Sequence, residues 1–112
     1  MTRYLALYMG SAENVDSTPP DAETQQKGMA AWGEWAASHT AAIVEQGAPL
    51  GKTKRMDKNG LSNTSNLITG YVLVEAASHE EAARIFERHP HFAVFSDKNS
   101  VEIIECLEMP SA

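Results

Sequence analysis

Cysteine and basic side chains are scarce in this chain of 112 residues. The single cysteine, Cys106, cannot form an intramolecular disulfide, so the fold needs no oxidising compartment. Nine basic against fifteen acidic side chains leave a formal net charge of −6, which argues against binding to nucleic acid or to an anionic membrane surface. One short basic cluster is expected to form a solvated strand face rather than a phosphate-binding track: Lys52, Lys54, Arg55 and Lys58.

Long hydrophobic segments are missing as well. No apolar run approaches the roughly 20 residues of a membrane-spanning helix. The first ten residues, MTRYLALYMG, lack the basic segment and the long apolar stretch of a signal peptide. We therefore expect a cytoplasmic protein with no membrane partner. Cys106 lies in the apolar run VEIIECLEM and is expected to be a small core residue rather than a nucleophile.

The chain does contain strand and helix patterns in alternation. A Thr-Pro-Pro-Asp run at residues 18–21 predicts a helix start with Thr18 as the cap, and Gly47 predicts its end. Ser78 and Glu81 have the spacing of a capping box. The predicted elements are a strand at 3–9, a helix at 19–46, strands at 50–56 and 67–76, a short inward-packed helix at 79–89, a loop at 91–99 and a strand at 101–109, with a polar loop at 57–66.

This order predicts an α+β fold of the ferredoxin-like type, βαββαβ, in one domain over residues 1–112. Four antiparallel strands would carry both helices on one face. In the first strand, Leu5, Leu7 and Met9 alternate with aromatic and small side chains, so both faces of the sheet are apolar. Two helices cover only one face, and a bare apolar face is rare on a monomer. We therefore expect a homodimer.

Six short segments recur along almost the whole chain in a recognisable order and spacing. They are YLALY at 4–8, MAAWG at 29–33, APLG at 48–51, TGY at 69–71, PHF at 90–92 and VEI at 101–103. Together they resemble the YCII-related family, which is allied to the DGPF-domain proteins. The resemblance implies a dimeric α+β barrel, in which two ferredoxin-like sheets pack face to face with a cleft near the interface.

The family's chemistry points to the first helix. YCII proteins carry a histidine there, proposed to act with an acidic partner as a catalytic dyad. Counting back from Gly47 places that position near Ala36, and His39 lies three residues later on about the same face. His39 is therefore the stand-in that the resemblance suggests. The Asp-Gly-Pro-Phe sequence of the DGPF group is absent, and NLITG occupies residues 66–70.

Two histidines are the candidate catalytic residues, because an imidazole titrates near neutrality and serves as acid or base. They are His39 and His91; the alternative for His39 is packing against Trp35 with a backbone hydrogen bond. His89, Pro90 and His91 form a histidine pair before Asp97, but no further ligand is in view, so no metal site is predicted. We expect a helix-ending turn with exposed or capping histidines there, and His91 rather than His89 in a pocket because His91 matches the family.

The candidate ligand-binding residues are mostly aromatic: Tyr8, Trp32, Trp35, Tyr71 and Asp97. The two tryptophans share a helix stripe that also includes Met29, Ala36, His39 and Ile43, and they would equally serve as core or interface anchors. The two tyrosine hydroxyls would orient a ligand in a cavity between sheets or reach solvent at its rim. No glycine-rich phosphate loop or nucleophile elbow is present, and no cofactor is predicted.

Two functions remain open from the sequence. The first is an enzyme or binding protein for a small molecule, with its cleft between the sheet and the first helix near the dimer interface. The second is a non-catalytic interaction or regulatory module that uses the barrel surface. A partly polar cavity with converging histidines and tyrosines would favour the first, and a filled interior the second. No motif in the chain names a substrate.

Overall fold

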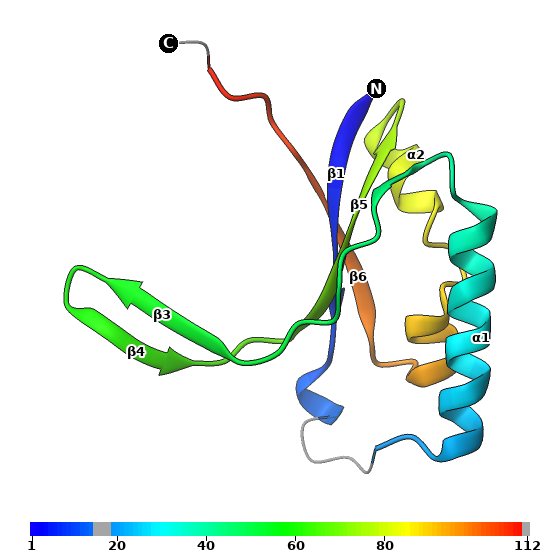
Figure 1. The fold of residues 1–112 in the computed structure, drawn as a ribbon, viewed down its shortest axis with the longest axis horizontal. Coiled ribbons are helices and arrows are strands. Elements are labelled where there is room, and N and C mark those ends of the chain that lie inside the picture. Colours follow the sequence, from blue (N-terminus) through cyan, green and yellow to red (C-terminus); the bar gives the residue numbers. More distant parts are fainter. Residues whose placement is uncertain (15–18, 111–112) are drawn as a thin grey trace.

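The computed structural model describes residues 1–14 and 19–110 (Figure 1). Its helices and strands follow one another in the order given next. They are β1 (Thr2–Met9), η1 (Ala12–Asn14), α1 (Ala22–Ser38), β2 (Ile43–Glu45), β3 (Thr53–Asp57), β4 (Gly60–Thr64), β5 (Ile68–Ala76), α2 (His79–Arg84), η2 (His91–Phe95) and β6 (Ser100–Glu105).

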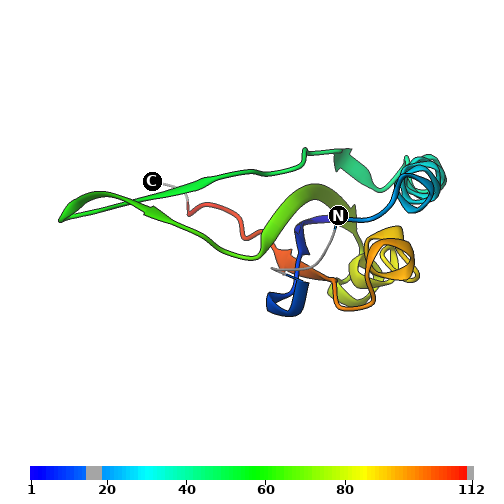
Figure 2. The ribbon, with the colours of Figure 1, turned by 90° about the horizontal axis from the view of Figure 1, so that it is seen from below.

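Four strands form the main sheet in the order β2-β5-β1-β6, with every neighbouring pair antiparallel. With the β3–β4 hairpin set aside, the elements run β-α-β-β-α-β, so the predicted α+β, ferredoxin-like fold is confirmed. Both helices lie on one side of this sheet, as Figures 1 and 2 show from two directions. Among the described residues, no helix is long and apolar enough to cross a membrane.

The hydrophobic core lies between the sheet and the helices. Strand alternation sends every second side chain of β1 and β5 toward the helices, as predicted. The buried members are Tyr4, Ala6, Tyr8, Val72, Val74 and Ala76 from the sheet, and Trp35, Ala82 and Phe86 from the helical side. Leu5, Leu7 and Met9 lie on the opposite, helix-free face and are half-buried.

The first helix ends earlier than predicted. It stops at Ser38, and the chain turns and enters β2, where Ile43 pairs with Val74. The prediction of helix to residue 46 was wrong because its last turn is β-branched and gains sheet hydrogen bonds, including Glu75 N–H to the Ala42 carbonyl at 2.8 Å. The helix does start where predicted, but Asp21 is the cap, accepting from Thr24 N–H at 2.7 Å. Thr18, the predicted cap, lies outside the described residues.

Gly47 follows β2 and is required there for two reasons. Its φ of +69° is in the left-handed region that side chains disfavour, and a Cβ would overlap the Tyr71 carbonyl. The left-handed conformation predicted from the sequence is therefore present. It serves the turn after an edge strand, however, rather than the end of the helix.

The second predicted strand, 50–56, and the polar loop after it are not part of the main sheet. β3 and β4 instead pair with each other as a separate two-stranded hairpin that projects from the body of the molecule (Figure 1). Asp57 Oδ1 accepts from Asn59 N–H at 2.8 Å in the predicted turn, and Gly60 has a φ of +112°. We call residues 52–66 the arm. Its basic cluster is exposed, as expected.

The second helical region is more irregular than predicted. Ser78 Oγ caps α2 by accepting from Glu81 N–H at 3.1 Å, which confirms the predicted cap. The helix ends at Arg84 rather than near residue 89, Arg88 has a φ of +58°, and η2 is a π-helix where a loop was predicted. π-Helical turns are frequent at functional sites.

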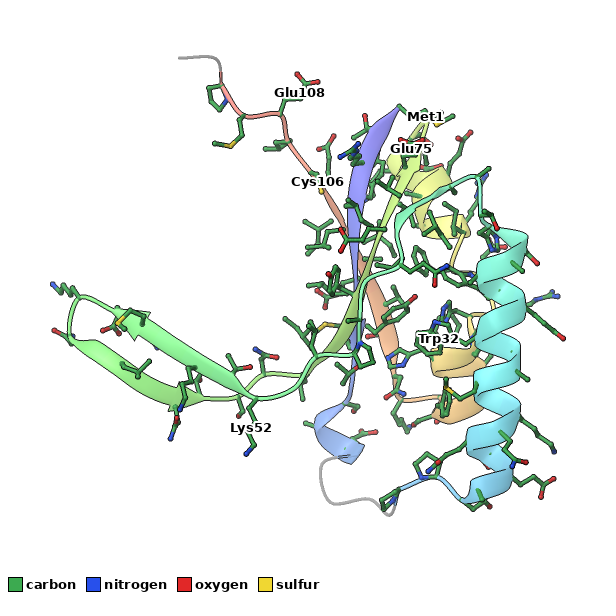
Figure 3. All side chains as sticks on the ribbon, viewed as in Figure 1. Met1, Trp32, Lys52, Glu75, Cys106 and Glu108 are labelled. Atoms are coloured by element: carbon green, nitrogen blue, oxygen red, sulfur yellow. The ribbon has the colours of Figure 1, made fainter. Side chains whose placement is uncertain are left out.

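Two residues expected in the interior lie at the surface. Cys106 is exposed because β6 ends at Glu105 and the chain leaves the sheet there (Figure 3). Met29 is 67% exposed on the outer side of α1. The core stripe of α1 is instead centred on Gly28 and Trp35, its two buried residues.

Candidate functional site

Four aromatic side chains and two imidazoles gather around Tyr8 between the sheet, α1 and η2. We call this set the imidazole–aromatic cluster. Its members are Tyr8, Trp32, Trp35, Phe86, His89, His91 and Phe95, which come from β1, α1, the turns after α2, and η2. The cluster joins the N-terminal third of the chain to its last third, so only the folded structure assembles it.

His89 lies at the centre of the cluster and is fully buried. Its Nδ1 accepts the backbone N–H of His91 at 3.0 Å, so the neutral ring carries its proton on Nε2. That Nε2–H donates to the Tyr8 hydroxyl oxygen at 3.3 Å. Burial lowers the pKa of His89 to about 3, and the charges of His91 and His39 lower it further. His89 is therefore neutral at physiological pH and fixes the orientation of Tyr8.

Tyr8 is the hydroxyl group of the cluster. Because its oxygen accepts from His89, its own proton is directed toward another acceptor. Burial raises the pKa of the Tyr8 hydroxyl above its ordinary value, so the group stays protonated. Its ring centroid lies 4.7 Å from that of Trp32 and 5.4 Å from that of His91. Tyr8 is thus a held hydrogen-bond donor beside an imidazole and an indole.

His91 is the second imidazole, with 7% of its surface exposed. Its Nε2 lies 2.8 Å from the carbonyl oxygen of Met9, which can only accept, so Nε2 carries the proton. Nδ1 then holds the lone pair. Burial lowers the pKa of His91, and the hydrogen bond to Met9 opposes this shift in part. His91 is a neutral imidazole whose Nδ1 can accept a proton or a hydrogen bond.

Trp32 forms the half-buried edge of the cluster. It projects from α1 into the space between helix and sheet (Figure 3). Its ring stands perpendicular to His89, with centroids 4.5 Å apart, and lies 6.1 Å from His91. Trp35 lies deeper, 8% exposed, and its Nε1–H donates to the Ile85 carbonyl at 2.8 Å. Trp32 therefore presents an aromatic surface toward solvent, whereas Trp35 is a core anchor.

His39 has the contacts of a packing residue. It is half-buried at the end of α1, with its ring 5.3 Å from that of Trp35. Its Nδ1–H donates to the Trp35 carbonyl at 2.8 Å. This is the arrangement described above as the alternative to catalysis. His39 lies at the periphery of the cluster, and His91 lies within it.

Tyr71 and Asp97 lie away from the cluster. Tyr71 points to the helix-free face, where its hydroxyl donates to Glu45 Oε1 at 2.8 Å and Glu45 raises its pKa. Tyr8 and Tyr71 therefore face opposite sides of the sheet and do not converge on one cavity. Asp97 is exposed in the turn after η2.

The histidine pair was placed wrongly by sequence reasoning. His89 and His91 are buried, whereas exposed or capping side chains were expected. Pro90 has helical backbone angles, which turns the chain instead of extending it. The signal that was available is the apolar setting of the pair, IFERHPHFAVF, which is unusual for solvated histidines. Within residues 1–14 and 19–110, no group of three His, Cys, Asp or Glu side chains is placed to hold a metal ion.

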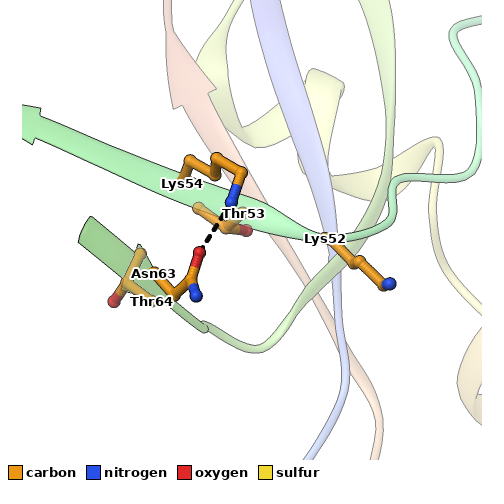
Figure 4. A pocket seen from close by; sticks show the side chains of 5 residues that line it. All are labelled: Lys52, Thr53, Lys54, Asn63 and Thr64. Carbon is orange, nitrogen blue, oxygen red and sulfur yellow. Dashed lines mark hydrogen bonds between the residues drawn. The ribbon is translucent and has the colours of Figure 1, made fainter. Parts of the chain in front are cut away.

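A second feature is a hollow of about 280 Å³ at the base of the arm (Figure 4). It is lined by Lys52, Thr53, Lys54, Asn63 and Thr64. Lys54 Nζ donates to Asn63 Oδ1 at 2.7 Å across it. The hollow carries positive charge but no residue of the imidazole–aromatic cluster.

No known family model matches the chain, and no curated protein matches it in sequence. By fold, it is similar to 5-chloro-2-hydroxyhydroquinone dehydrochlorinase (TftG) from Burkholderia phenoliruptrix AC1100, solved in complex with 2,5-dihydroxybenzoquinone. The TM-score is 0.50 and the identity 18%, with 89% of this chain and 90% of that chain covered. At this identity, the likeness shows a shared fold.

Proposed function

We propose that residues 1–112 form one YCII-like domain that assembles as a homodimer and binds or acts on a small molecule at the edge of the imidazole–aromatic cluster. The observation that carries this proposal is the state of His91. A neutral imidazole with the lone pair on Nδ1 is held among aromatic rings by a hydrogen bond to the Met9 carbonyl. Such convergent polar groups in an aromatic setting are typical of ligand sites.

The three groups at this edge would each contact a ligand in a different way. Trp32 offers an aromatic face to a planar molecule. His91 Nδ1 would accept a proton or hydrogen bond from the ligand, and the Tyr8 hydroxyl would donate one. His89 takes no direct part, because its Nδ1 already accepts from the chain and its pKa of about 3 makes it a poor base. His39 is also set aside, because its Nδ1–H is used by the Trp35 carbonyl.

The ligand class that suits these groups is a planar, hydroxylated ring. An aromatic wall favours a flat molecule, and an acceptor beside a donor favours hydroxyl and carbonyl substituents. The dehydrochlorinase of similar fold was solved with 2,5-dihydroxybenzoquinone, a molecule of this kind. We therefore choose that compound as the probe. In catalysis, His91 would be the general base that removes a hydroxyl proton.

The test is calorimetric titration of the purified protein with 2,5-dihydroxybenzoquinone at pH 7.5. We expect saturable binding, weakened about tenfold or more in His91→Gln because a buried hydrogen-bond acceptor is replaced. His79→Gln is the matched control, because His79 starts α2 and donates to the Ile103 carbonyl outside the cluster. Absence of binding by the wild-type protein, or equal affinity of both variants and the wild type, would contradict the proposal.

A second function, a non-catalytic interaction module, is favoured by one different observation. The arm carries exposed apolar and basic side chains that contact no part of the core. Small-molecule binding and assembly through the arm are compatible, because the cluster and the arm lie on opposite sides of the main sheet (Figures 1 and 2).

A further inference from the structure

The arm lacks the packing that normally stabilises a hairpin. Every residue of β3 and β4 is exposed except Thr53, which is half-buried. A two-stranded hairpin on its own is marginally stable in water, and it usually needs a third strand or another packed surface. A hairpin with regular pairing from Thr53–Thr64 to Asp57–Gly60 therefore calls for a partner.

The two faces of the arm differ in character. Met56 and Leu61 are directly paired across the strands and share one face with Lys54 and Asn63. They are 70% and 62% exposed. The other face is polar, with Arg55 paired to Asp57 at 3.4 Å. The arm thus presents one face that is apolar near the tip and basic toward the base.

The helix-free face of the main sheet is the second unpartnered surface. Strand alternation places there the apolar side chains Leu5, Leu7, Met9, Tyr71, Leu73 and Ile104. Three carboxylates, Glu45, Glu75 and Glu102, lie around them, with Arg3 beside Glu75. This face is therefore apolar at its centre and mainly acidic at its rim.

The arm projects on the same side of the sheet as this face. Figures 1 and 2 show the helices on one side of the main sheet and the arm on the other. A five-residue strand such as β3 spans about 17 Å, whereas packed sheets lie roughly 10 Å apart. A second sheet seated on the helix-free face would therefore lie within reach of the arm.

We propose that this occupant is a second copy of the chain, and that the arm of each protomer packs on the acidic, apolar helix-free side of its partner. The proposal extends the homodimer stated under Proposed function. Met56 and Leu61 would bury against apolar side chains, and the lysines would approach the glutamates of the partner's rim. By two-fold symmetry, each protomer would give one arm and receive one.

Charge complementarity favours a second copy over other partners. The arm has four basic and one acidic side chain, a formal charge of +3, in a chain whose total is −6. The remainder of the chain therefore carries −9 and attracts the arm of another copy. A nucleic acid would be attracted by the arm but repelled by everything else.

The experiment compares two methionines of equal exposure in the full chain. Sedimentation over a range of concentrations should give a mass of about twice 12.2 kDa for the wild type. The double variant Met56→Ser, Leu61→Ser should raise the dimer dissociation constant about tenfold or more. Met29→Ser, at 67% exposure on the outer side of α1 against 70% for Met56, should leave it unchanged. Circular dichroism would establish that both variants are folded.

Hydrogen exchange of residues 53–64 gives an independent measurement. Amides of the arm should be protected above the dissociation constant and exchange rapidly on dilution below it. A dimer whose constant is the same in the double variant would overturn the role of the arm while leaving the homodimer intact. A chain that stays monomeric at every concentration would overturn both. Exclusive binding of the arm to a DNA duplex, without self-association, would also overturn it. Ligand binding at His91 is measured separately and can fail or succeed on its own.

Discussion

The imidazole–aromatic cluster and the arm are opposites in how they satisfy their side chains. In the cluster, His89 and His91 each have a fixed tautomer because backbone and hydroxyl groups determine which nitrogen carries the proton. In the arm, Met56 and Leu61 contact mainly each other and solvent. The cluster can therefore be understood within one protomer, whereas the arm makes physical sense only with a partner. Substitutions in the two regions should accordingly change different quantities.

The largest effect is expected for Trp35→Ala in the cluster. The side chain is 8% exposed, and its Nε1–H donates to the Ile85 carbonyl. Its removal should lower the free energy of unfolding by about 3–5 kcal/mol. Chemical denaturation at a fixed protein concentration measures this. Trp32→Ala, at the half-buried edge, should cost less; the reverse order would show that we have misassigned the anchor.

Acid should destabilise the cluster next. The pKa of His89 is about 3 when folded and near 6.5 when unfolded, so the unfolded chain binds the proton more readily between these values. Stability should therefore fall as the pH is lowered through this window, by about 2 kcal/mol from pH 7 to pH 5. His91, whose pKa is also lowered, adds to the same trend.

Urea denaturation at pH 7, 6 and 5 measures the slope, and His89→Gln should flatten it. His79→Gln, outside the cluster, serves as the control and should leave it unchanged. A stability that is constant from pH 7 to pH 5 in the wild type would contradict the burial of a neutral imidazole.

Two glycines of α1 sharpen the contrast between buried and exposed faces. A Cβ at Gly28 would overlap the Phe95 ring, so Gly28→Ala should destabilise by about 1–3 kcal/mol. A Cβ at Gly33 meets nothing within 4 Å, so Gly33→Ala should stabilise the helix by about 0.5–1 kcal/mol. Thermal and chemical denaturation of both variants give the difference, and equal signs would contradict the packing of η2 against α1.

The smallest effect is expected in the arm. Leu61→Ser should change the unfolding free energy of the monomer by less than about 0.5 kcal/mol, because the side chain is 62% exposed. The measurement is chemical denaturation at a concentration where sedimentation shows monomer. A loss comparable to that of Trp35→Ala would mean that the arm belongs to the core of its own protomer.

Sequence reasoning succeeded where structure depends on near neighbours. The alternation in β1 and β5, the cap at Ser78 and the turn at Asp57 are local patterns, and each is present. It failed at residues 39–46, where no strong helix breaker precedes Gly47 and the choice of β2 depends on pairing with β5. It also failed for the arm, because a polar strand gives no sign of whether it joins the main sheet or leaves it.

For this protein, the sequence by itself determined the order of the main elements, the two apolar faces of the sheet and the presence of histidines in both halves. Only the tertiary structure decided which imidazoles are buried and what they contact. Tyr8 and His89 are 81 residues apart, and Met9 and His91 are 82 apart, so no local pattern encodes their hydrogen bonds. Periodicity shows which face of an element is apolar, but the identity of the facing side chain depends on how the elements pack.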